Sequence, residues 1–151
     1  MGTDGEANLV EIFASAQGEG PHVGRSTVFV RFGECDLRCA WCDSPGTWRP
    51  TRSCRIETAP GSGEFDSEPN PVALPVLAQA LARLTPSPHS FLSLTGGEPL
   101  LQVEAVAAAA RLGRERGMRV HLETHGLASE ALAQVADRID VVSMDWKLTS
   151  D

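Results

Sequence analysis

The sequence lacks any lysine- or arginine-rich tract. Lys147 is the only lysine, and 13 basic residues stand against 20 acidic ones, which gives a formal net charge of −7. Proteins that bind a phosphate backbone directly usually carry the opposite balance. We therefore expect no direct nucleic-acid partner.

A membrane-spanning run and a leader-like start are also missing. No uninterrupted apolar stretch approaches the ~18 residues that a membrane span needs. Residues 1–6 contain neither a basic segment nor an apolar one, so we infer no secretion signal. We expect no membrane partner and a cytoplasmic, reducing location. The 151 residues are enough for a single domain with its own core.

Cysteine is scarce, but three of the four cysteines lie in one short stretch. Cys35, Cys39 and Cys42 are separated by three and then two residues, and Cys54 follows later. Thiolates are soft ligands that favour iron–sulfur clusters, zinc or copper(I). A four-iron cluster takes one thiolate per iron, so three cysteines would leave one iron without a protein ligand.

Three other interpretations of these cysteines compete with a cluster. A disulfide framework needs an oxidising compartment, to which nothing in the sequence points. A structural zinc site needs a fourth ligand, which Cys54 or a histidine could supply, but such sites more often pair two Cys-x-x-Cys knuckles. Free buried cysteines rarely lie this close together in sequence. We expect Cys54 to take no part in the site.

Hydrophobic periodicity predicts an α/β chain of alternating strands and helices. Strands are expected over residues 9–13, 27–33, 91–95, 119–123 and 139–143, and helices over residues 72–84, 100–116 and 129–138. Such alternation favours parallel βα units. A complete eightfold barrel takes ~250 residues, so we expect a single domain folded as a partial, open TIM-like βα barrel with parallel strands. Residues 51–70, rich in Pro, Gly, Ser and acidic residues, are expected to form a surface insertion.

A cluster of polar residues directly follows each of four predicted strands. The clusters are the cysteine loop after 27–33, Gly96-Gly97-Glu98-Pro99 after 91–95, Glu123-Thr124-His125-Gly126 at the end of 119–123, and Ser143-Met144-Asp145-Trp146-Lys147 at the end of 139–143 and after it. The carboxyl ends of parallel strands lie on one face of a sheet or barrel, where such folds build their binding sites. We therefore expect one site at this rim.

Several of these residues have both a functional and a plain structural interpretation. Glu98 could accept a hydrogen bond from a ligand ammonium, or belong to an ordinary turn before a helix. Arg31 could pair with a ligand carboxylate, or lie in solvent on an edge strand. Trp41 could cover a cluster or an adenine ring, or pack against its neighbours. His121 shares a strand face with Glu123 and is expected to be a paired interior histidine.

The cysteine loop, with Trp41 just before its last cysteine, resembles that of the radical S-adenosylmethionine (SAM) enzymes. In that superfamily the amino and carboxylate groups of SAM chelate the open iron. The Gly96-Gly97-Glu98-Pro99 stretch resembles the GGEP motif, which holds the methionine end of SAM. Residues 11–20 (EIFASAQGEG), 42–48 (CDSPGTW) and 143–148 (SMDWKL) are similar to the 7-carboxy-7-deazaguanine synthase family. The resemblance covers nearly the whole chain apart from the expected insertion.

This resemblance implies a lyase that converts 6-carboxy-5,6,7,8-tetrahydropterin to 7-carboxy-7-deazaguanine with loss of ammonia, a step towards queuosine and other deazapurines. The reduced cluster cleaves SAM, and the 5′-deoxyadenosyl radical takes a hydrogen from the substrate. The implied cofactors are a [4Fe-4S] cluster, SAM and Mg²⁺. The implied partners are the pterin substrate, a reductase or flavodoxin-type electron donor and, for a homodimer, a second copy of the chain. Because the cofactor supplies the radical, we assign no protein residue as general acid or base.

The resemblance also implies roles for particular side chains. The cluster is held by Cys35, Cys39 and Cys42, and Mg²⁺ by Ser44. The residues implied to bind the pterin are Ala16, Gln17, Gly18, Arg31 and Thr95. The residues implied to bind SAM are Trp41, Asp43, Gly97, Glu98, Glu123, Thr124, Ser143 and Lys147.

The chain departs from this family pattern in two places. Family members usually continue past the point where this chain stops, after Thr149-Ser150-Asp151, with a further strand. We expect that strand to be missing and the SAM and substrate pockets to be more open. His125 stands where relatives commonly have Asn or Ser. The alternatives are another small radical SAM enzyme, such as a glycyl-radical activase, or a non-catalytic cluster- or zinc-binding module that is a truncated relic.

Overall fold

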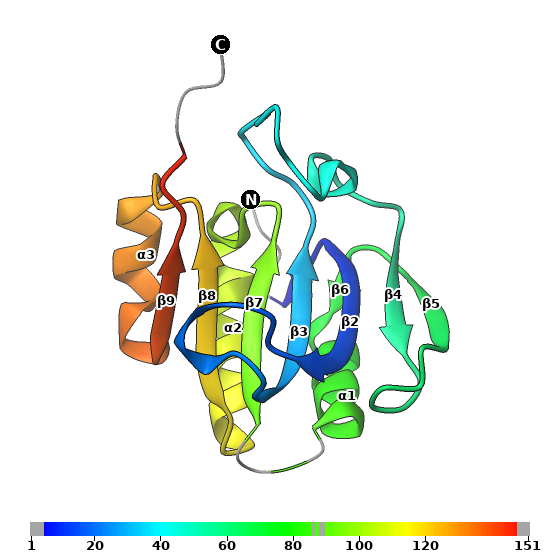
Figure 1. Ribbon diagram of the computed structural model, residues 1–151. Coiled ribbons are helices and arrows are strands. Elements are labelled where there is room, and N and C mark those ends of the chain that lie inside the picture. The colour runs from blue at the N-terminus through cyan, green and yellow to red at the C-terminus, as the bar shows by residue number, and fades with distance from the viewer. Residues whose placement is uncertain (1–4, 86, 88–89, 148–151) are drawn as a thin grey trace.

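The computed structural model describes residues 5–85, 87 and 90–147, which form a mixed α/β fold (Figure 1). The described strands make a seven-stranded sheet of order β5-β4-β2-β3-β7-β8-β9 and a separate β1-β6 pair. The strands are β1 (Glu6–Ala7), β2 (Leu9–Ala16), β3 (Ser26–Phe32), β4 (Ser53–Glu57), β5 (Phe65–Pro69), β6 (Val72–Ala73), β7 (Phe91–Gly96), β8 (Arg119–Thr124) and β9 (Val141–Met144). The helices are α1 (Leu74–Leu84), α2 (Val103–Glu115) and α3 (Ser129–Val135), with 3-10 turns at Gly20–His22, Pro45–Thr47, Pro99–Gln102 and Ala136–Arg138.

The end of the chain lies outside the described residues, and the described helices test the prediction of no membrane span. Leu148, the last residue of the SMDWKL motif, and Thr149-Ser150-Asp151 lie outside the described residues. None of the described helices is long and apolar enough to cross a membrane.

Strands β3, β7, β8 and β9 form the parallel part of the sheet, as the alternating pattern predicts. Their register aligns Val30 with Leu94, Leu94 with Leu122, and Leu122 with Val142. Helix α2 connects β7 to β8, and helix α3 connects β8 to β9. The carboxyl ends of the four strands therefore lie at the same edge of the sheet, at the top of Figure 1.

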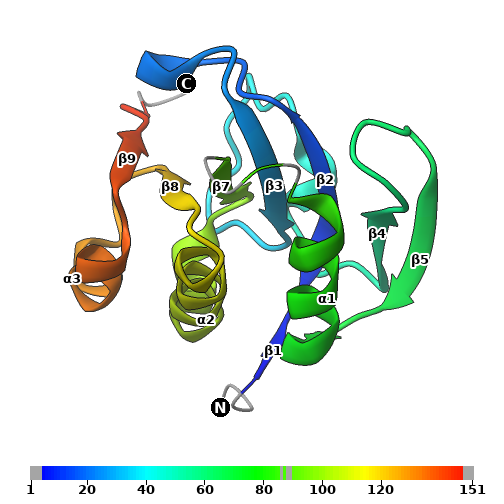
Figure 2. The ribbon, with the colours of Figure 1, turned by 90° about the horizontal axis from the view of Figure 1, so that it is seen from below.

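Helices α1, α2 and α3 lie on one side of the sheet (Figure 2). In α1, Leu77, Leu81 and Leu84 recur at helical spacing and are buried in the core. In α2, Gly113 lies so close to β7 that an added Cβ would approach Leu92 Cδ2 to 2.6 Å. The helices therefore bury one face of the sheet, and the opposite face remains for other contacts.

Strand β2 runs antiparallel to β3, which corrects the expectation of parallel strands throughout. The two strands pair from Leu9 with Phe32 to Ala16 with Ser26. Residues 17–25 join them and contain one short 3-10 turn. A parallel crossover needs roughly a dozen residues or more, usually with a helix. The connection is too short for a crossover, so the second strand has to turn back along the first.

The expectation of a surface insertion over residues 51–70 is wrong for most of that stretch. Strand β4 pairs in parallel with β2 and antiparallel with β5, so both strands extend the main sheet. Cys54 and Ile56 of β4 are buried in the core, whereas Arg55 between them is exposed and lies over the Phe65 ring at 4.2 Å. The few apolar residues of this segment are thus placed at alternate positions, which overall composition does not reveal.

The side chains of strand β3 alternate between the two faces of the sheet. Val28, Val30 and Phe32 are fully buried in the core that the helices cover. Phe29 and Arg31 point to the other face and line a cavity. Side chains in a strand alternate between faces, so this strand contributes to the core and to the site at once.

Candidate functional site

A cavity of about 790 Å³ extends over the free face of the sheet to the carboxyl ends of β3, β7, β8 and β9. Every residue that the sequence places in a site lines this cavity, except Glu98. The lining residues among those predicted are Ala16, Gln17, Gly18, Arg31, Cys35, Cys39, Trp41, Cys42, Asp43, Ser44, Thr95, Gly97, Glu123, Thr124, Ser143 and Lys147. The expected gathering of the polar clusters at one rim is therefore confirmed.

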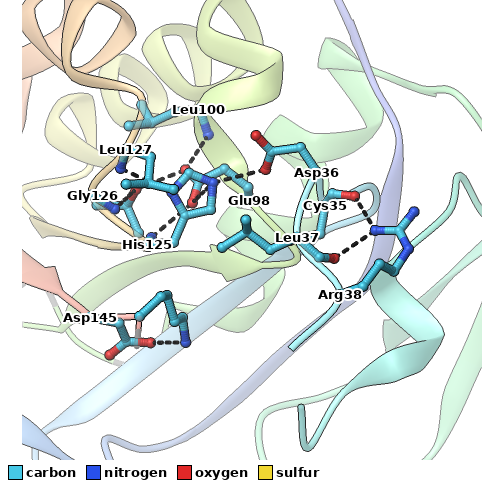
Figure 3. A network of polar contacts seen from close by, with 12 residues as sticks. Cys35, Asp36, Leu37, Arg38, Glu98, Leu100, His125, Gly126, Leu127 and Asp145 are labelled. Carbon is cyan, nitrogen blue, oxygen red and sulfur yellow. Dashed lines mark hydrogen bonds and ion pairs between the residues drawn. The ribbon is translucent and has the colours of Figure 1, made fainter. Parts of the chain in front are cut away.

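The cysteine loop, residues 35–42, is held in part by hydrogen bonds within its own backbone. Cys42 N donates to Cys39 O over 3.1 Å. Arg38 Nη1 donates to the carbonyl oxygens of Cys35 (2.7 Å) and Leu37 (2.6 Å), as Figure 3 shows. The guanidinium therefore fixes the turn that separates the first two thiols.

The four cysteines have two kinds of environment. Cys35, Cys39 and Cys42 are free thiols of intermediate exposure at the cavity wall. Burial raises the pKa of Cys35, a backbone hydrogen bond at Leu37 opposes this, and the Asp36 carboxylate adds to the rise. Cys54 is fully buried in the apolar core, where burial raises its pKa to about 12. Because the thiolate is the metal ligand, Cys54 is unsuited to that role.

The donor set fits an iron–sulfur cluster with one open iron. Three soft sulfur ligands come from one loop and face one cavity, while the fourth thiol lies in the core. Across residues 5–85, 87 and 90–147, no group of three or more His, Cys, Asp or Glu side chains is already drawn together to hold a metal ion. On donor chemistry, three thiolates would leave one iron of a four-iron cluster available to an exogenous ligand.

Glu123 is held at the cavity wall by three hydrogen bonds from neighbouring side chains. Its Oε1 accepts from Ser93 Oγ (2.7 Å) and from Gln17 Nε2 (3.3 Å), and its Oε2 accepts from Thr95 Oγ1 (2.6 Å). Gln17 Oε1 in turn accepts from the backbone N–H of Gly18 (2.9 Å). These contacts fix the carboxylate and connect the loop after β2 to strands β7 and β8.

His121 is a paired interior histidine, as expected from its position on the Glu123 face of the strand. Its Nδ1 accepts from Gln17 Nε2 (3.2 Å), so Nε2 carries the proton and donates to Ser143 Oγ (2.7 Å). Burial lowers the pKa of His121, although the Glu123 carboxylate raises it. The neutral imidazole of His121 therefore holds the Ser143 hydroxyl at the cavity wall.

Glu98 does not line the cavity, which corrects the expectation that it contacts a ligand ammonium. Its side chain is fully buried. Oε1 accepts from Thr124 Oγ1 over 2.8 Å. Oε1 also accepts from Leu100 N (3.0 Å), and Oε2 accepts from His125 N (2.9 Å), as Figure 3 shows. Buried carboxylates require such partners, and here the partners join the turn after β7 to the end of β8.

Gly97 brings the turn after β7 directly against the start of the cysteine loop. Its backbone N–H donates to Phe32 O (3.1 Å), and the next N–H, of Glu98, donates to Glu34 O (2.8 Å). An added Cβ at Gly97 would collide with the Glu34 carbonyl oxygen and lie 2.9 Å from Thr47 O. Only glycine permits this approach, because any side chain would occupy the space of a neighbouring backbone.

Two cationic side chains line the cavity, and each is paired with an acid. Arg31 Nε lies 3.0 Å from Glu11 Oε1, so the edge-strand interpretation of a solvent arginine does not apply. Lys147 Nζ lies 2.6 Å from Asp145 Oδ2, and this hydrogen bond raises the pKa of Lys147. The cavity therefore presents fixed positive charge at two separate places.

The residues on either side of Cys42 supply an exposed ring and hard oxygen atoms. Trp41 is 53% exposed and lines the cavity. Ser44 Oγ donates to Asp43 Oδ1 over 3.1 Å, so a hydroxyl and a carboxylate lie side by side at the wall. Oxygen atoms of this kind are the ligands that Mg²⁺ prefers.

Sequence reasoning missed two pairs of residues at this site. The rings of Phe13 and Phe29 stack with centroids 5.0 Å apart and form an apolar part of the wall. Asp36 Oδ1 and His125 Nε2 lie 2.9 Å apart and connect the cysteine loop to the end of β8. Strand alternation could have placed both rings on the Arg31 face, but no local signal points to the second pair.

A family model described as a 4Fe-4S single cluster domain matches residues 16–148. The chain belongs to this family. Membership in a 4Fe-4S single cluster domain family agrees with the thiols of the cysteine loop at the cavity wall. The matched residues include every predicted site residue.

Curated relatives of this 4Fe-4S domain carry the name 7-carboxy-7-deazaguanine synthase. The chain is 41% identical to that of Geobacter sulfurreducens over 95% of its own length and 58% of the relative. It is 41% identical to that of Thermococcus kodakarensis over 92% of this chain and 58% of the relative. It is 39% identical to that of Methanopyrus kandleri over 99% of this chain and 63% of the relative. The chain thus spans about three fifths of the length of these relatives.

The same fold occurs in a solved structure, the crystal structure of QueE from Escherichia coli. The two superimpose with a TM-score of 0.63 at 24% identity, over 80% of this chain and 53% of that chain. This similarity supports the mixed α/β architecture with a parallel part of the sheet.

Proposed function

We propose that the chain acts as a radical SAM lyase that converts 6-carboxy-5,6,7,8-tetrahydropterin to 7-carboxy-7-deazaguanine with loss of ammonia, in queuosine or other deazapurine biosynthesis. The observation that carries this proposal is one cavity lined by the three free thiols, Arg31 and the bare backbone of Gly97. The names of the curated relatives point to the same product.

In this proposal the cysteine loop and the strand ends bind the cofactors. Cys35, Cys39 and Cys42 would hold a [4Fe-4S] cluster, which would leave one iron open to SAM. When bound, the cluster and SAM supply a 5′-deoxyadenosyl radical that removes a hydrogen atom from the substrate. The residues proposed to orient SAM are Trp41, Asp43, Gly97, Glu123, Thr124, Ser143 and Lys147, all at the cavity wall. Glu98 acts indirectly, since it fixes Thr124 from beneath the wall.

The face of the sheet between β2 and β3 is proposed to bind the pterin. The stacked rings of Phe13 and Phe29 offer a flat apolar wall to a planar heterocycle. Arg31 follows Phe29 by two residues on the same face of β3, and it can pair with the substrate carboxylate. The other proposed pterin contacts are Ala16, Gln17, Gly18 and Thr95.

Ser44 is proposed to bind Mg²⁺ between the cysteine loop and the substrate. A hard cation accepts a hydroxyl oxygen, keeps several waters and can bridge to a substrate carboxylate. The neighbouring Asp43 carboxylate would add negative charge at the same place. Both side chains are at the cavity wall, which supports this assignment.

We extend the proposal to the setting in which the chain works. Residues 1–151 belong to one radical SAM domain, built as a partial and open TIM-like barrel. Four free thiols suit a reducing, cytoplasmic location. The expected partners are a reductase or flavodoxin-type electron donor and, in a homodimer, a second copy of the chain.

An anaerobic assay tests the proposal. The 151-residue chain is reconstituted with iron and sulfide and incubated with SAM, Mg²⁺, a reductant and the carboxy-tetrahydropterin. The expected result is a deazapurine chromophore together with 5′-deoxyadenosine. SAM cleavage without use of the pterin would favour a glycyl-radical activase. Stoichiometric zinc binding with no four-iron cluster would favour a non-catalytic module.

A further inference from the structure

His125 lies at the end of β8, in the turn that leads to α3, and its imidazole is buried. Its side chain is 4% exposed, whereas that of its partner Asp36 is 52% exposed. Asp36 follows Cys35 directly, and the two partners are separated by 89 residues in the chain. A buried ring of one strand end therefore contacts an exposed residue of the cysteine loop.

The hydrogen bonds of His125 define which nitrogen carries the proton. Nδ1 accepts from the backbone N–H of Leu127 (3.0 Å), so the neutral ring is protonated at Nε2. Nε2 lies 2.9 Å from Asp36 Oδ1 and 3.4 Å from Glu98 Oε2 (Figure 3). The hydrogen bond from Leu127 thus orients the ring, and the ring directs its Nε2–H towards the Asp36 carboxylate in the cysteine loop.

Among the described residues, the other hydrogen bonds of the cysteine loop do not reach the strand ends. Arg38 bonds carbonyl groups inside the loop and, at 3.4 Å, the Trp48 carbonyl. The backbone of the turn after β7 bonds Phe32 and Glu34, which precede the loop. Within the described part of the chain, the Asp36–His125 contact is the one hydrogen bond that joins residues 35–42 to β7, β8 or the turns that follow them.

We propose that His125 is a positioning residue that anchors the Cys35 end of the cysteine loop through Asp36. The anchor restricts the loop before any metal binds, so less conformational freedom is lost when three thiols are gathered. The proposal rests on the proposed function, because it takes residues 35–42 as the cluster-binding loop.

The first measurement uses the metal-free 151-residue chain. Amide hydrogen exchange of residues 35–42 is compared between the wild type and Asp36→Ala. Loss of one charge-assisted hydrogen bond should accelerate exchange there about threefold to tenfold. Asp36 is half-exposed, so the variant should fold and keep its thermal midpoint. Asp66→Ala, which removes an exposed carboxylate elsewhere, is the matched control and should leave exchange in the loop unchanged.

Two variants of His125 separate anchoring from general packing. In His125→Gln the amide nitrogen occupies nearly the position of Nε2, so it can still donate to Asp36. In His125→Asn the amide nitrogen corresponds to Nδ1 and cannot reach that carboxylate. His125→Gln should therefore retain slow exchange in the loop, and His125→Asn should match Asp36→Ala. In the loaded protein, iron loss to a chelator should follow the same order.

The outcomes distinguish this proposal from the function on which it rests. Wild-type exchange rates in Asp36→Ala, or equal rates in His125→Gln and His125→Asn, would overturn the anchor. A wild-type chain that takes up no iron would overturn the proposed function, and the exchange data on the metal-free chain would still decide whether the anchor exists.

Discussion

Arg31 and Glu11 form an ion pair across the antiparallel β2–β3 pair, with Arg31 Nε 3.0 Å from Glu11 Oε1. The other oxygen of Glu11 lies 3.8 Å from Arg55 Nη1, so Glu11 is shared between two guanidinium groups. The side chains of Arg31 and Glu11 are 25% and 21% exposed. Glu11 thus orients Arg31 through Nε, and within the described residues neither terminal nitrogen of Arg31 has a hydrogen-bond or ion-pair partner.

Replacing Arg31 with alanine should weaken pterin binding much more than SAM binding. Charge-assisted bidentate pairs contribute about 1.5–3 kcal/mol, so pterin affinity should fall about tenfold or more. Arg31→Lys should be intermediate, because an ammonium cannot reproduce the planar pair of donors. Anaerobic equilibrium dialysis with each ligand measures both effects. An unchanged pterin affinity would remove Arg31 from the pocket.

Gly97→Ala should destabilise the fold, whereas Gly46→Ala should not. The new methyl group at position 97 would collide with the Glu34 backbone, but at position 46 nothing lies within 4 Å. Overpacking against backbone costs about 1–3 kcal/mol. Urea denaturation of the two variants gives the comparison. Equal stability of the two would mean that the turn after β7 moves away from the cysteine loop at little cost.

Cys42→Ala and Cys54→Ala should have opposite effects on iron and on stability. Cys42 lines the cavity, so its loss should prevent formation of an intact cluster and abolish SAM cleavage. Cys54 lies in the core, so its loss should leave the iron content unchanged and cost about 1 kcal/mol of stability. Iron and sulfide analysis and thermal denaturation measure the two quantities. Equal loss of iron in both variants would mean that the ligand set is different.

Glu57→Gln should reduce the acid sensitivity of stability. Burial raises the pKa of Glu57, but backbone N–H groups, among them those of Ala14 and Gly63, outweigh this and lower it below its ordinary value. The ionised carboxylate therefore stabilises the fold above about pH 4.5, and this contribution is lost as pH falls through the folded-state pKa. At neutral pH the variant should be about 1–3 kcal/mol less stable, because an amide cannot accept on both sides.

The gap between wild type and Glu57→Gln should then narrow as the solution is acidified. Chemical denaturation at neutral pH and below pH 4.5 measures it. Glu64→Gln, at an exposed position of the same hairpin, is the matched control and should track the wild type at every pH. A gap that stays constant on acidification would show that folding does not lower the pKa of Glu57.

The rim of the site could be predicted from the sequence because its signals are local. The cysteine spacing and the Gly-Gly-Glu-Pro turn each follow a strand, and parallel strands bring their carboxyl ends together whatever their distance in sequence. The direction in which a side chain points from a turn is not determined by nearby residues in the sequence. Glu98 was expected to reach a ligand, but Thr124 and His125 of the next strand end draw it inward.

The strands β4 and β5 and the antiparallel β2–β3 pair show the second limit. In β4 only Cys54 and Ile56 carry the apolar signal, and polar residues surround them in sequence. Their burial depends on pairing with β2, which lies about forty residues earlier in the printed sequence. The Asp36–His125 contact likewise joins residues that are distant in sequence, so no pattern within either segment encodes it.

The two faces of β3 have a consequence for how this protein can be altered. Phe29 and Arg31 can be exchanged for other side chains to change what the cavity accepts, while Val28 and Val30 continue to pack in the core. Inserting or deleting one residue in the strand would do something different, because it would turn the guanidinium into the apolar layer and a valine into the cavity. Libraries aimed at new ligand preferences should therefore vary identity along this strand and leave its length untouched.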